Sequence, residues 1–165
     1  MLRRARLAAG AVALSTAVCG AAPAQINEWL ADSGIRLEPS LEKLVESGAP
    51  DGAPRYDLQR GPNAADGEQF VLTVRFTNTL GATVDGVRIT SAIPAGLRYV
   101  PGSATAPGGF VLLSADGGRT FGAERELAQR GTEAAPVVYT HVRWLLEAPL
   151  ESGVSGFVRL RASKH

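Results

Sequence analysis

The stretch FVLTVRFTN, residues 70–78, places a large apolar side chain at every second position. These side chains belong to Phe70, Leu72, Val74 and Phe76. Successive side chains of a β-strand point to opposite faces, so this pattern gathers all four on one face and leaves mainly polar groups on the other. A helix would scatter the same four residues around its circumference. The stretch therefore predicts a β-strand with one face in a hydrophobic core.

Short apolar stretches of this kind recur along the chain, and clusters of Gly, Pro, Asn, Asp and Ser separate them. Val87, Ile89 and Ile93 share one face of a second strand, which Pro94 ends because proline has no amide hydrogen to donate. Further strands are expected at Phe110–Ser114, Val137–Glu147 and Gly156–Ala162. This spacing of strands and turns is typical of an all-β sandwich or barrel, here with about seven antiparallel strands.

Two segments that precede these strands are less clear. Residues 35–47, IRLEPSLEKLVES, fit either a strand or a short helix. Residues 26–34, INEWLADSG, fit a helical turn. Neither segment changes the fold class that the later strands predict.

The first 24 residues have the three parts of a secretory signal peptide. A basic start is followed by the apolar run LAAGAVALSTAVCG and by the small residues Ala22 and Ala24 around Pro23. The run is shorter than the roughly 18 residues that a spanning helix needs, so no membrane span is expected after cleavage. Cleavage before Gln25 gives a signal peptide at 1–24, an extension at 25–34 and one domain at 35–165. An N-terminal helix that stays in the protein is the alternative.

Loss of this leader changes both the charge and the cysteine content. Three arginines leave with it, out of 17 basic residues against 16 acidic ones, so the mature chain is close to neutral and slightly negative. This balance indicates neither nucleic acid nor an anionic membrane surface as a partner. Cys19 is the only cysteine, so the mature chain has no disulfide and no thiolate ligand or nucleophile. Lipidation of Cys19 stays open, although Val18 stands where a small residue is preferred.

The stretch SADGGRTF, residues 114–121, follows the pattern Ser-x-Asp-x-Gly-x-Thr-aromatic. The fixed positions are Ser114, Asp116, Gly118, Thr120 and Phe121. The pattern resembles the Asp box of sialidase-like propellers, where it recurs once per blade and shapes a β-hairpin turn away from the catalytic centre. A single copy in a chain of this length cannot build a propeller. We therefore interpret it as a structural hairpin turn.

Residues 70–104, from FVLTVRFTN to PGSA, carry a second and longer pattern. Its positions are Asn78, Thr79, Gly81, Val87, Ile89, Pro94, Gly96, Leu97, Tyr99, Val100, Gly102 and Ser103. The pattern resembles domain of unknown function 11, a conserved repeat of bacterial and archaeal surface proteins, in its small single-domain exported form. The resemblance covers most of 35–162 and implies an immunoglobulin-like β-sandwich outside the cytoplasm, with no established catalytic residues. Ser91 departs from it, because an aspartate is usual there.

The residues that could carry catalysis are few and scattered. His141 lies inside an expected strand and His165 is the last residue, so neither predicts a Ser-His-Asp arrangement or a zinc site. The carboxylates Asp116, Glu124 and Glu126 lie in or near a turn, where such groups are usually solvated or capping. Phosphate-binding and dinucleotide-binding glycine patterns are missing from the sequence. We therefore expect no enzyme, no cofactor, no metal and no catalytic residue.

The aromatic and basic residues of the strands leave a binding function open. The aromatic ones are Tyr99, Phe110, Phe121, Tyr139, Trp144 and Phe157, and they fit core packing or an exposed row that stacks on sugar rings. Arg88, Arg98, Arg143, Arg159 and Arg161 alternate with apolar residues, as on solvated sheet faces. In the expected strand at 137–147, alternation puts Tyr139 on the face of His141 and Arg143, opposite Val142 and Trp144.

The sequence as a whole predicts an exported, non-catalytic β-sandwich of the cell envelope, periplasmic or secreted. Its partner is an unknown envelope protein or a glycan, and the expected role is protein interaction, structure or adhesion. A carbohydrate-binding domain is the alternative, and a small hydrolase is the third possibility. An aromatic row would distinguish a glycan binder, and an exposed sheet edge would distinguish a protein-binding module.

The leader predicts a specific mature N-terminus. Mass spectrometry of the exported protein is expected to give a chain that begins at Gln25, because Ala22 and Ala24 supply the cleavage site. A mature chain that begins at a diacylglycerol-modified Cys19 would contradict this.

Overall fold

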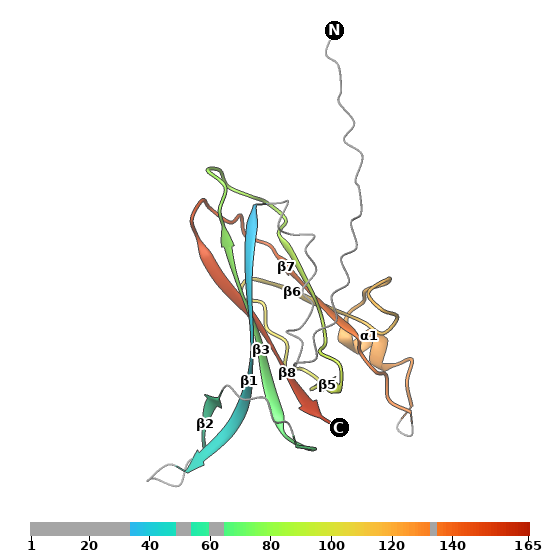
Figure 1. The fold of residues 1–165 in the computed structure, drawn as a ribbon. Coiled ribbons are helices and arrows are strands. Elements are labelled where there is room, and N and C mark those ends of the chain that lie inside the picture. The colour runs from blue at the N-terminus through green and yellow to red at the C-terminus, as the bar shows by residue number, and fades with distance from the viewer. Residues whose placement is uncertain (1–33, 49–53, 60–64, 133–134) are drawn as a thin grey trace, which may run out of the picture.

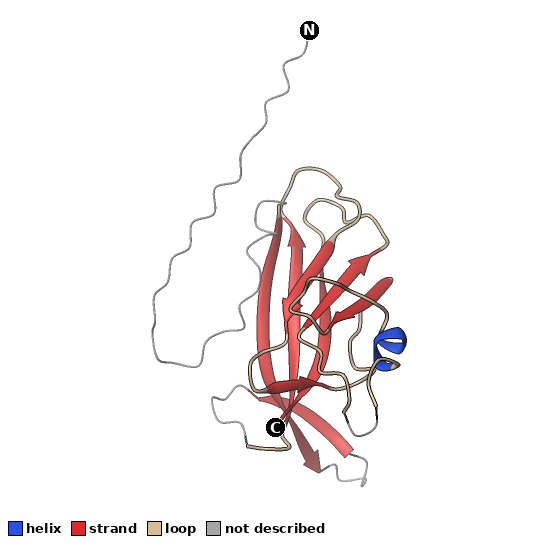
Figure 2. Ribbon diagram, turned by 90° about the vertical axis from the view of Figure 1, so that its right-hand side faces the viewer, coloured by secondary structure: helices blue, strands red, loops and turns tan. Residues whose placement is uncertain are grey.

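The computed structural model describes residues 34–48, 54–59, 65–132 and 135–165, which form two antiparallel β-sheets around one hydrophobic core. The expected signal peptide lies outside these residues, as does the expected helical turn except for Gly34. Figures 1 and 2 show the two layers of strands. The wider sheet has the order β2 (Pro54–Gln59), β1 (Ile35–Gly48), β3 (Gln69–Asn78), β8 (Ser155–Lys164), β5 (Leu97–Tyr99). The narrower sheet has the order β4 (Arg88–Ala92), β7 (His141–Leu146), β6 (Gly109–Ser114).

Strand β3 lies between β1 and β8 and contributes most to the core of the wider sheet. Leu72 and Val74 are fully buried, and Phe76 is 6% exposed. Their cross-strand partners on β8 include Leu160 and Val158, which are also fully buried. The expected alternation is therefore confirmed from Leu72 to Phe76, whereas Val71 on the opposite face is also buried. Burying each large apolar side chain contributes roughly 1.5 to 3 kcal/mol.

The narrower sheet supplies the opposite wall of the core. Ile89 of β4 and Trp144 of β7 are directly paired and both fully buried. Val142 of β7 and Leu113 of β6 form a second buried pair. Side chains of both sheets belong to the same apolar cluster. The two sheets thus cover each other's apolar faces, as in a β-sandwich.

The structure settles the assignment of residues 35–48 and corrects the expected start of β7 and the expected position of Tyr139. Residues 35–48 form a strand, so the choice between strand and helix is settled in favour of the strand. Strand β7 begins at His141 instead of at residue 137. Tyr139 precedes it and is only 8% exposed, so it lies in the core and not on the face of His141 and Arg143. Alternation holds only inside a strand, and Tyr139 lies outside one.

Two further elements complete the described chain. A short helix, α1 (Glu124–Ala128), follows the turn at 114–121 and buries Leu127. The sequence did not indicate this helix. Eight strands are present in the described residues, where about seven were expected. Strands β2 and β5 were not among the expected ranges. Figure 1 shows β2, paired with the last part of β1, at the lower end of the molecule.

The two faces of β3 predict different mutational costs. Phe76→Ala is expected to lower the free energy of unfolding by about 3 to 5 kcal/mol, because the lost ring leaves a cavity beside Gly156. Arg75→Ala is expected to change it by no more than about 0.5 kcal/mol, since Arg75 is exposed. Chemical denaturation measures both. Equal costs at the two positions would mean that the face assignment is wrong.

Candidate functional site

The turn at 114–121 is closed by its own side chains. The Asp116 carboxylate accepts hydrogen bonds from the backbone amides of Arg119 and Thr120 at 3.0 Å each, and from the hydroxyls of Ser114 and Thr120. The Ser114 hydroxyl oxygen in turn accepts the amide hydrogen of Gly118 at 3.0 Å. Donation by the Thr120 hydroxyl and amide is the main reason why the pKa of Asp116 lies well below its usual range. The turn is therefore a locally complete hydrogen-bonded unit.

The chain after this turn does not continue as a second long strand. Leu113 and Gly122 exchange two backbone hydrogen bonds of 2.9 and 3.0 Å, which form a single bridge. Helix α1 then begins at Glu124. The expected hairpin is thus reduced to a turn with one bridging pair, because the chain enters the helix at once.

The same turn covers part of the outer face of β7. A Cβ added at Gly118 would lie 3.2 Å from the His141 ring, so the two residues are in close contact. The Phe121 ring lies 3.7 Å from the guanidinium carbon of Arg143, whose Nε donates to the Thr90 hydroxyl. The turn and β7 are therefore joined by a cation–π contact as well as by the backbone.

Ser114, Asp116 and His141 lie near one another, because Ser114 and His141 are direct cross-strand partners. Their hydrogen bonds do not form a catalytic relay. Ser114 donates to Asp116, and His141 Nδ1 contacts the hydroxyl of its neighbour Thr140 at 3.1 Å. A hydrolytic triad instead needs the histidine between the hydroxyl and the acid. The arrangement fastens the turn to the sheet.

Asn78 is fully buried at the far end of β3, where it satisfies three backbone groups. Its side-chain amide donates to the carbonyls of Ala82 and Leu150 at 2.8 Å each, and its Oδ1 accepts the amide hydrogen of Leu80 at 2.9 Å. These bonds tie the loop after β3 to the loop before β8. Loss of this side chain would leave buried polar groups without partners.

Tyr99, Gly102 and Glu124 form a second polar cluster. The Tyr99 hydroxyl donates to Glu124 at 2.9 Å, and the Gly102 amide donates to the same carboxylate at 2.9 Å. Burial raises the pKa of Tyr99 to about 12, and Glu124 adds to this shift. Tyr99 also packs edge-on against Tyr139 at 5.6 Å between ring centroids. The sequence indicated Tyr99 and Gly102 but not this role of Glu124, because the contact joins residues far apart in the chain.

Pro94 and Gly96 form the tight turn between β4 and β5. The carbonyl of Pro94 accepts the amide hydrogen of Leu97 at 3.0 Å, and Gly96 has a φ of +78°. Side-chain-bearing residues rarely adopt that φ, so glycine is required there. Asn78, Pro94, Gly96 and Gly102 of the longer sequence pattern thus lie at turns and loop anchors, whereas Val87 and Ile89 lie in the core. Tyr99 and Gly102 meet through Glu124, but the pattern as a whole does not form one site.

The aromatic residues do not form one row. Tyr99, Tyr139 and Trp144 are buried in the core. Phe110 of β6 is 57% exposed and Phe157 of β8 is 47% exposed, and these two lie on different sheets. A continuous aromatic platform is therefore not present on the described strands. On the wider sheet the exposed rings are Phe157 of β8 and Tyr56 of β2, and β1 and β3 lie between these two strands.

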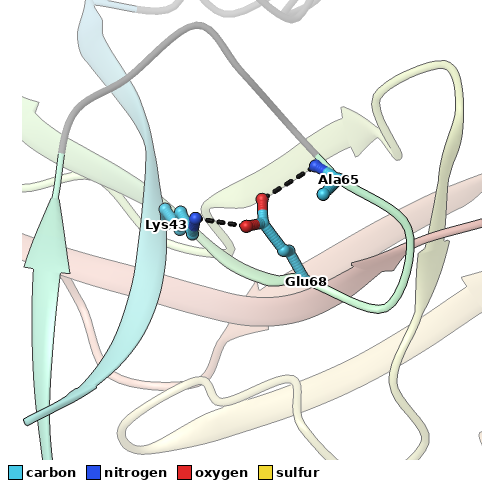
Figure 3. A network of polar contacts seen from close by, with 3 residues as sticks. All are labelled: Lys43, Ala65 and Glu68. Carbon is cyan, nitrogen blue, oxygen red and sulfur yellow. Dashed lines mark hydrogen bonds and ion pairs between the residues drawn. The ribbon is translucent and has the colours of Figure 1, made fainter.

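The polar contacts around Lys43 mark the point where β1 changes its pairing partner. Lys43 is paired with both Phe70 of β3 and Gln59 of β2. Figure 3 shows its ammonium group bound to the Glu68 carboxylate, which also accepts the amide hydrogen of Ala65 at 2.9 Å. The hydrogen bond from Lys43 is the main reason why the pKa of Glu68 is lowered. This ion pair fixes β1 to the turn that precedes β3.

Before Lys43, only one edge of β1 has a partner strand among the described residues. Strand β3 pairs with Ile35–Leu44, whereas β2 pairs only with Lys43–Gly48. Leu41 is 39% exposed beside this edge, and Leu58 and Tyr56 of β2 are 41% and 59% exposed. The edge of β1 over residues 35–42 is therefore a candidate interaction site.

Comparison of the chain with known protein families, curated proteins and solved structures gives no match. In the part of the chain that the structure describes, no group of three or more His, Cys, Asp or Glu side chains is placed to hold a metal ion. No helix among the described residues is long and apolar enough to cross a membrane.

The hydrogen bonds of Asp116 predict a dependence of stability on pH. The pKa of Asp116 is lower in the folded protein than its ordinary value of 3.8. The stability that the Asp116 carboxylate contributes is therefore complete above pH 3.8 and is lost as the pH falls below that value. We expect Asp116→Ala to melt at a lower temperature than the wild type near neutral pH. The difference is expected to shrink as the pH falls below about 4.

Thermal unfolding followed by circular dichroism across this pH range measures the difference. Asp85→Ala is the matched control, because Asp85 is exposed and has no hydrogen bond in the described structure. A difference for Asp116→Ala that stays constant down to the lowest pH would contradict the role of the carboxylate.

Proposed function

We propose that the protein is an exported, non-catalytic module of the cell envelope that binds an extended segment of a partner polypeptide along the free edge of β1. The bound segment would add a strand to the wider sheet. The observation that carries this proposal is the incomplete pairing of β1, which has β3 on one edge and no described partner on the other before Lys43. Strand addition to an exposed sheet edge is a recurrent mode of peptide recognition.

The backbone of β1 directs alternate residues to its two edges. The Gly34 carbonyl accepts the amide hydrogen of Thr79, which directly follows β3, at 2.8 Å. In an antiparallel ladder, hydrogen-bonded and non-hydrogen-bonded pairs alternate along the strand. The backbone groups of the even-numbered residues of β1 therefore bond to β3, and those of the odd-numbered residues point to the other edge of β1. The backbone groups of β1 that have no partner strand among the described residues are therefore those of Ile35, Leu37, Pro39 and Leu41. Pro39 falls at a position where the missing amide hydrogen costs no bond within the sheet.

The side chains around this edge define the chemistry of the partner segment. Leu37 is partly buried and packs against the core, and Leu41 is more exposed beside it. A bound strand would cover both with apolar residues at alternate positions. On the opposite face Glu38 is exposed, and an opposite charge across from it would add about 0.2 to 1 kcal/mol. Arg36 is exposed on the same face, so we infer a partner segment in which apolar residues alternate with charged ones, with a basic residue across from Glu38.

Other features support the remaining parts of this proposal. The leader at residues 1–24 supports export to the periplasm or beyond. The resemblance of residues 70–104 to a repeat of surface proteins supports an immunoglobulin-like classification of the sandwich. The hydrogen bonds of Ser114, Asp116 and His141 favour a structural role over a hydrolytic one.

The proposal predicts a defect in partner binding when the free edge of β1 is blocked. A photoreactive amino acid at Ser40 is used to crosslink the protein in intact cells, and mass spectrometry identifies the partner segment. We expect Leu41→Lys to abolish the crosslink, because a charge at an edge opposes strand addition. The melting temperature of this variant is expected to change little, since Leu41 is already 39% exposed.

A synthetic peptide of the crosslinked segment provides the direct test. On binding, hydrogen exchange is expected to slow at the amides of Leu37 and Leu41 and to stay unchanged at those of Glu38 and Ser40, which already bond to β3. Leu37→Ala, which keeps the amide, is the matched control for Leu37→Pro, which removes it. Unchanged exchange at Leu37 and Leu41, or a crosslink that survives Leu41→Lys, would overturn the proposal.

A further inference from the structure

The outer face of the wider sheet carries four arginines along one diagonal. Strands β3, β8 and β5 contain no aspartate or glutamate. Their inward residues include Val74, Leu160 and Tyr99, so the residues between them face outward. Arg75, Arg159, Arg161 and Arg98 are the outward basic residues, and all four are exposed. We call this set the arginine diagonal.

The pairing register places these arginines in sequence across three strands. Arg75 of β3 is opposite Phe157 of β8, and Arg98 of β5 is opposite Ser163 of β8. Arg159 and Arg161 lie between those two positions on β8. Neighbouring strands are about 4.8 Å apart, and alternate residues of one strand are about 6.7 Å apart. The arginine diagonal therefore presents repeated positive charges, more than a single small anion could occupy.

The arginine diagonal is only partly balanced by acidic groups of the described protein, since Glu38 lies opposite Arg75 alone. None of its four members takes part in an ion pair within the described residues, where the Lys43–Glu68 pair is found. The nearest acidic groups of the same face are on β1, where Glu38 is opposite Arg75 and Glu42 is opposite Val71. These two glutamates border the arginines on one side only. These charges favour an anionic polymer that lies across β3, β8 and β5, and they disfavour one that lies across β1.

A shallow hollow of about 240 Å³ lies at one end of the diagonal. Its lining includes Thr73, Arg75, Phe157 and Arg159. The guanidinium of Arg159 lies 4.4 Å from the centroid of the half-exposed Phe157 ring. The Thr73 hydroxyl is buried and has no hydrogen-bond partner in the described structure. The hollow thus combines a flat apolar ring, two guanidinium groups and an unused hydroxyl.

We propose that this face binds an acidic polysaccharide, whose carboxylates contact the arginine diagonal and one of whose sugar rings lies on Phe157. Guanidinium groups bind carboxylates through two parallel hydrogen bonds, and this geometry suits arginine better than lysine. The exposed ring offers an apolar surface to the carbon–hydrogen face of a sugar. One exposed ring beside the arginine diagonal does not provide the successive stacking platforms that single-stranded nucleic acid uses. This surface is separate from the free edge of β1, so a negative result for one proposed site does not decide the other.

Binding of oligogalacturonate to the purified mature protein tests the proposal, with the fully methyl-esterified oligosaccharide as the neutral comparison. Isothermal titration calorimetry at low and physiological salt gives the affinities. We expect binding of the acid that weakens as salt rises, and none of the ester. Arg159→Ala is expected to weaken binding by about tenfold or more, because a charge-assisted pair is lost. Phe157→Ala is expected to weaken it as well.

Two further variants separate recognition from general attraction. Arg159→Lys keeps the charge, so an affinity as weak as that of Arg159→Ala would support bidentate recognition, and full wild-type affinity would overturn it. Arg88→Ala removes an exposed arginine from the other sheet and is expected to leave binding unchanged. Equal binding of the methyl ester, of single-stranded DNA or of vesicles with anionic lipids would overturn the proposal, as would an equal loss with Arg88→Ala.

Discussion

The burial of every second side chain of β3 is the constraint on which the rest of the structure depends. Leu72 and Val74 are fully enclosed, and they are paired on one side with β1 and on the other with β8. A shift of one residue in either ladder would place Arg75 in the core and expose its apolar neighbours. The same constraint that builds the core therefore also holds the arginines of the wider sheet on its outer face.

The parts of the fold that were predictable from the sequence are those whose side chains alternate within one strand. Residues 70–78 and 156–162 are such segments, and the structure confirms both as strands. Residues 35–47 could not be assigned, because Pro39 and the charged residues obscure the period, and the pairing with β3 decides the matter. Tyr139 was misplaced because the chain enters β7 two residues later, and sequence alone does not give that starting point.

The candidate sites were less predictable, because they arise from contacts between distant parts of the chain. The local bonds of Asp116 follow from a pattern of eight residues. The role of Glu124 depends on β5 and α1 meeting, which no short pattern indicates. The free edge of β1 is visible only once β2 is known to pair with residues 43–48 alone. Likewise, the arginines of β3, β5 and β8 become neighbours only through the register of three strands.

The self-contained turn at 114–121 also bears on the order in which the chain assembles. The bonds that Asp116 and Ser114 make within it join residues no more than four positions apart. Closing so short a loop costs little chain entropy, whereas the ladder between β1 and β3 must bring together residues that are 25 or more positions apart. The turn can therefore form at a low cost in chain entropy, whereas most of the strand pairing joins residues that are far apart in the sequence. We accordingly expect the rate of folding to be set by the meeting of β1, β3 and β8, and not by the turn whose sequence pattern is the most conspicuous.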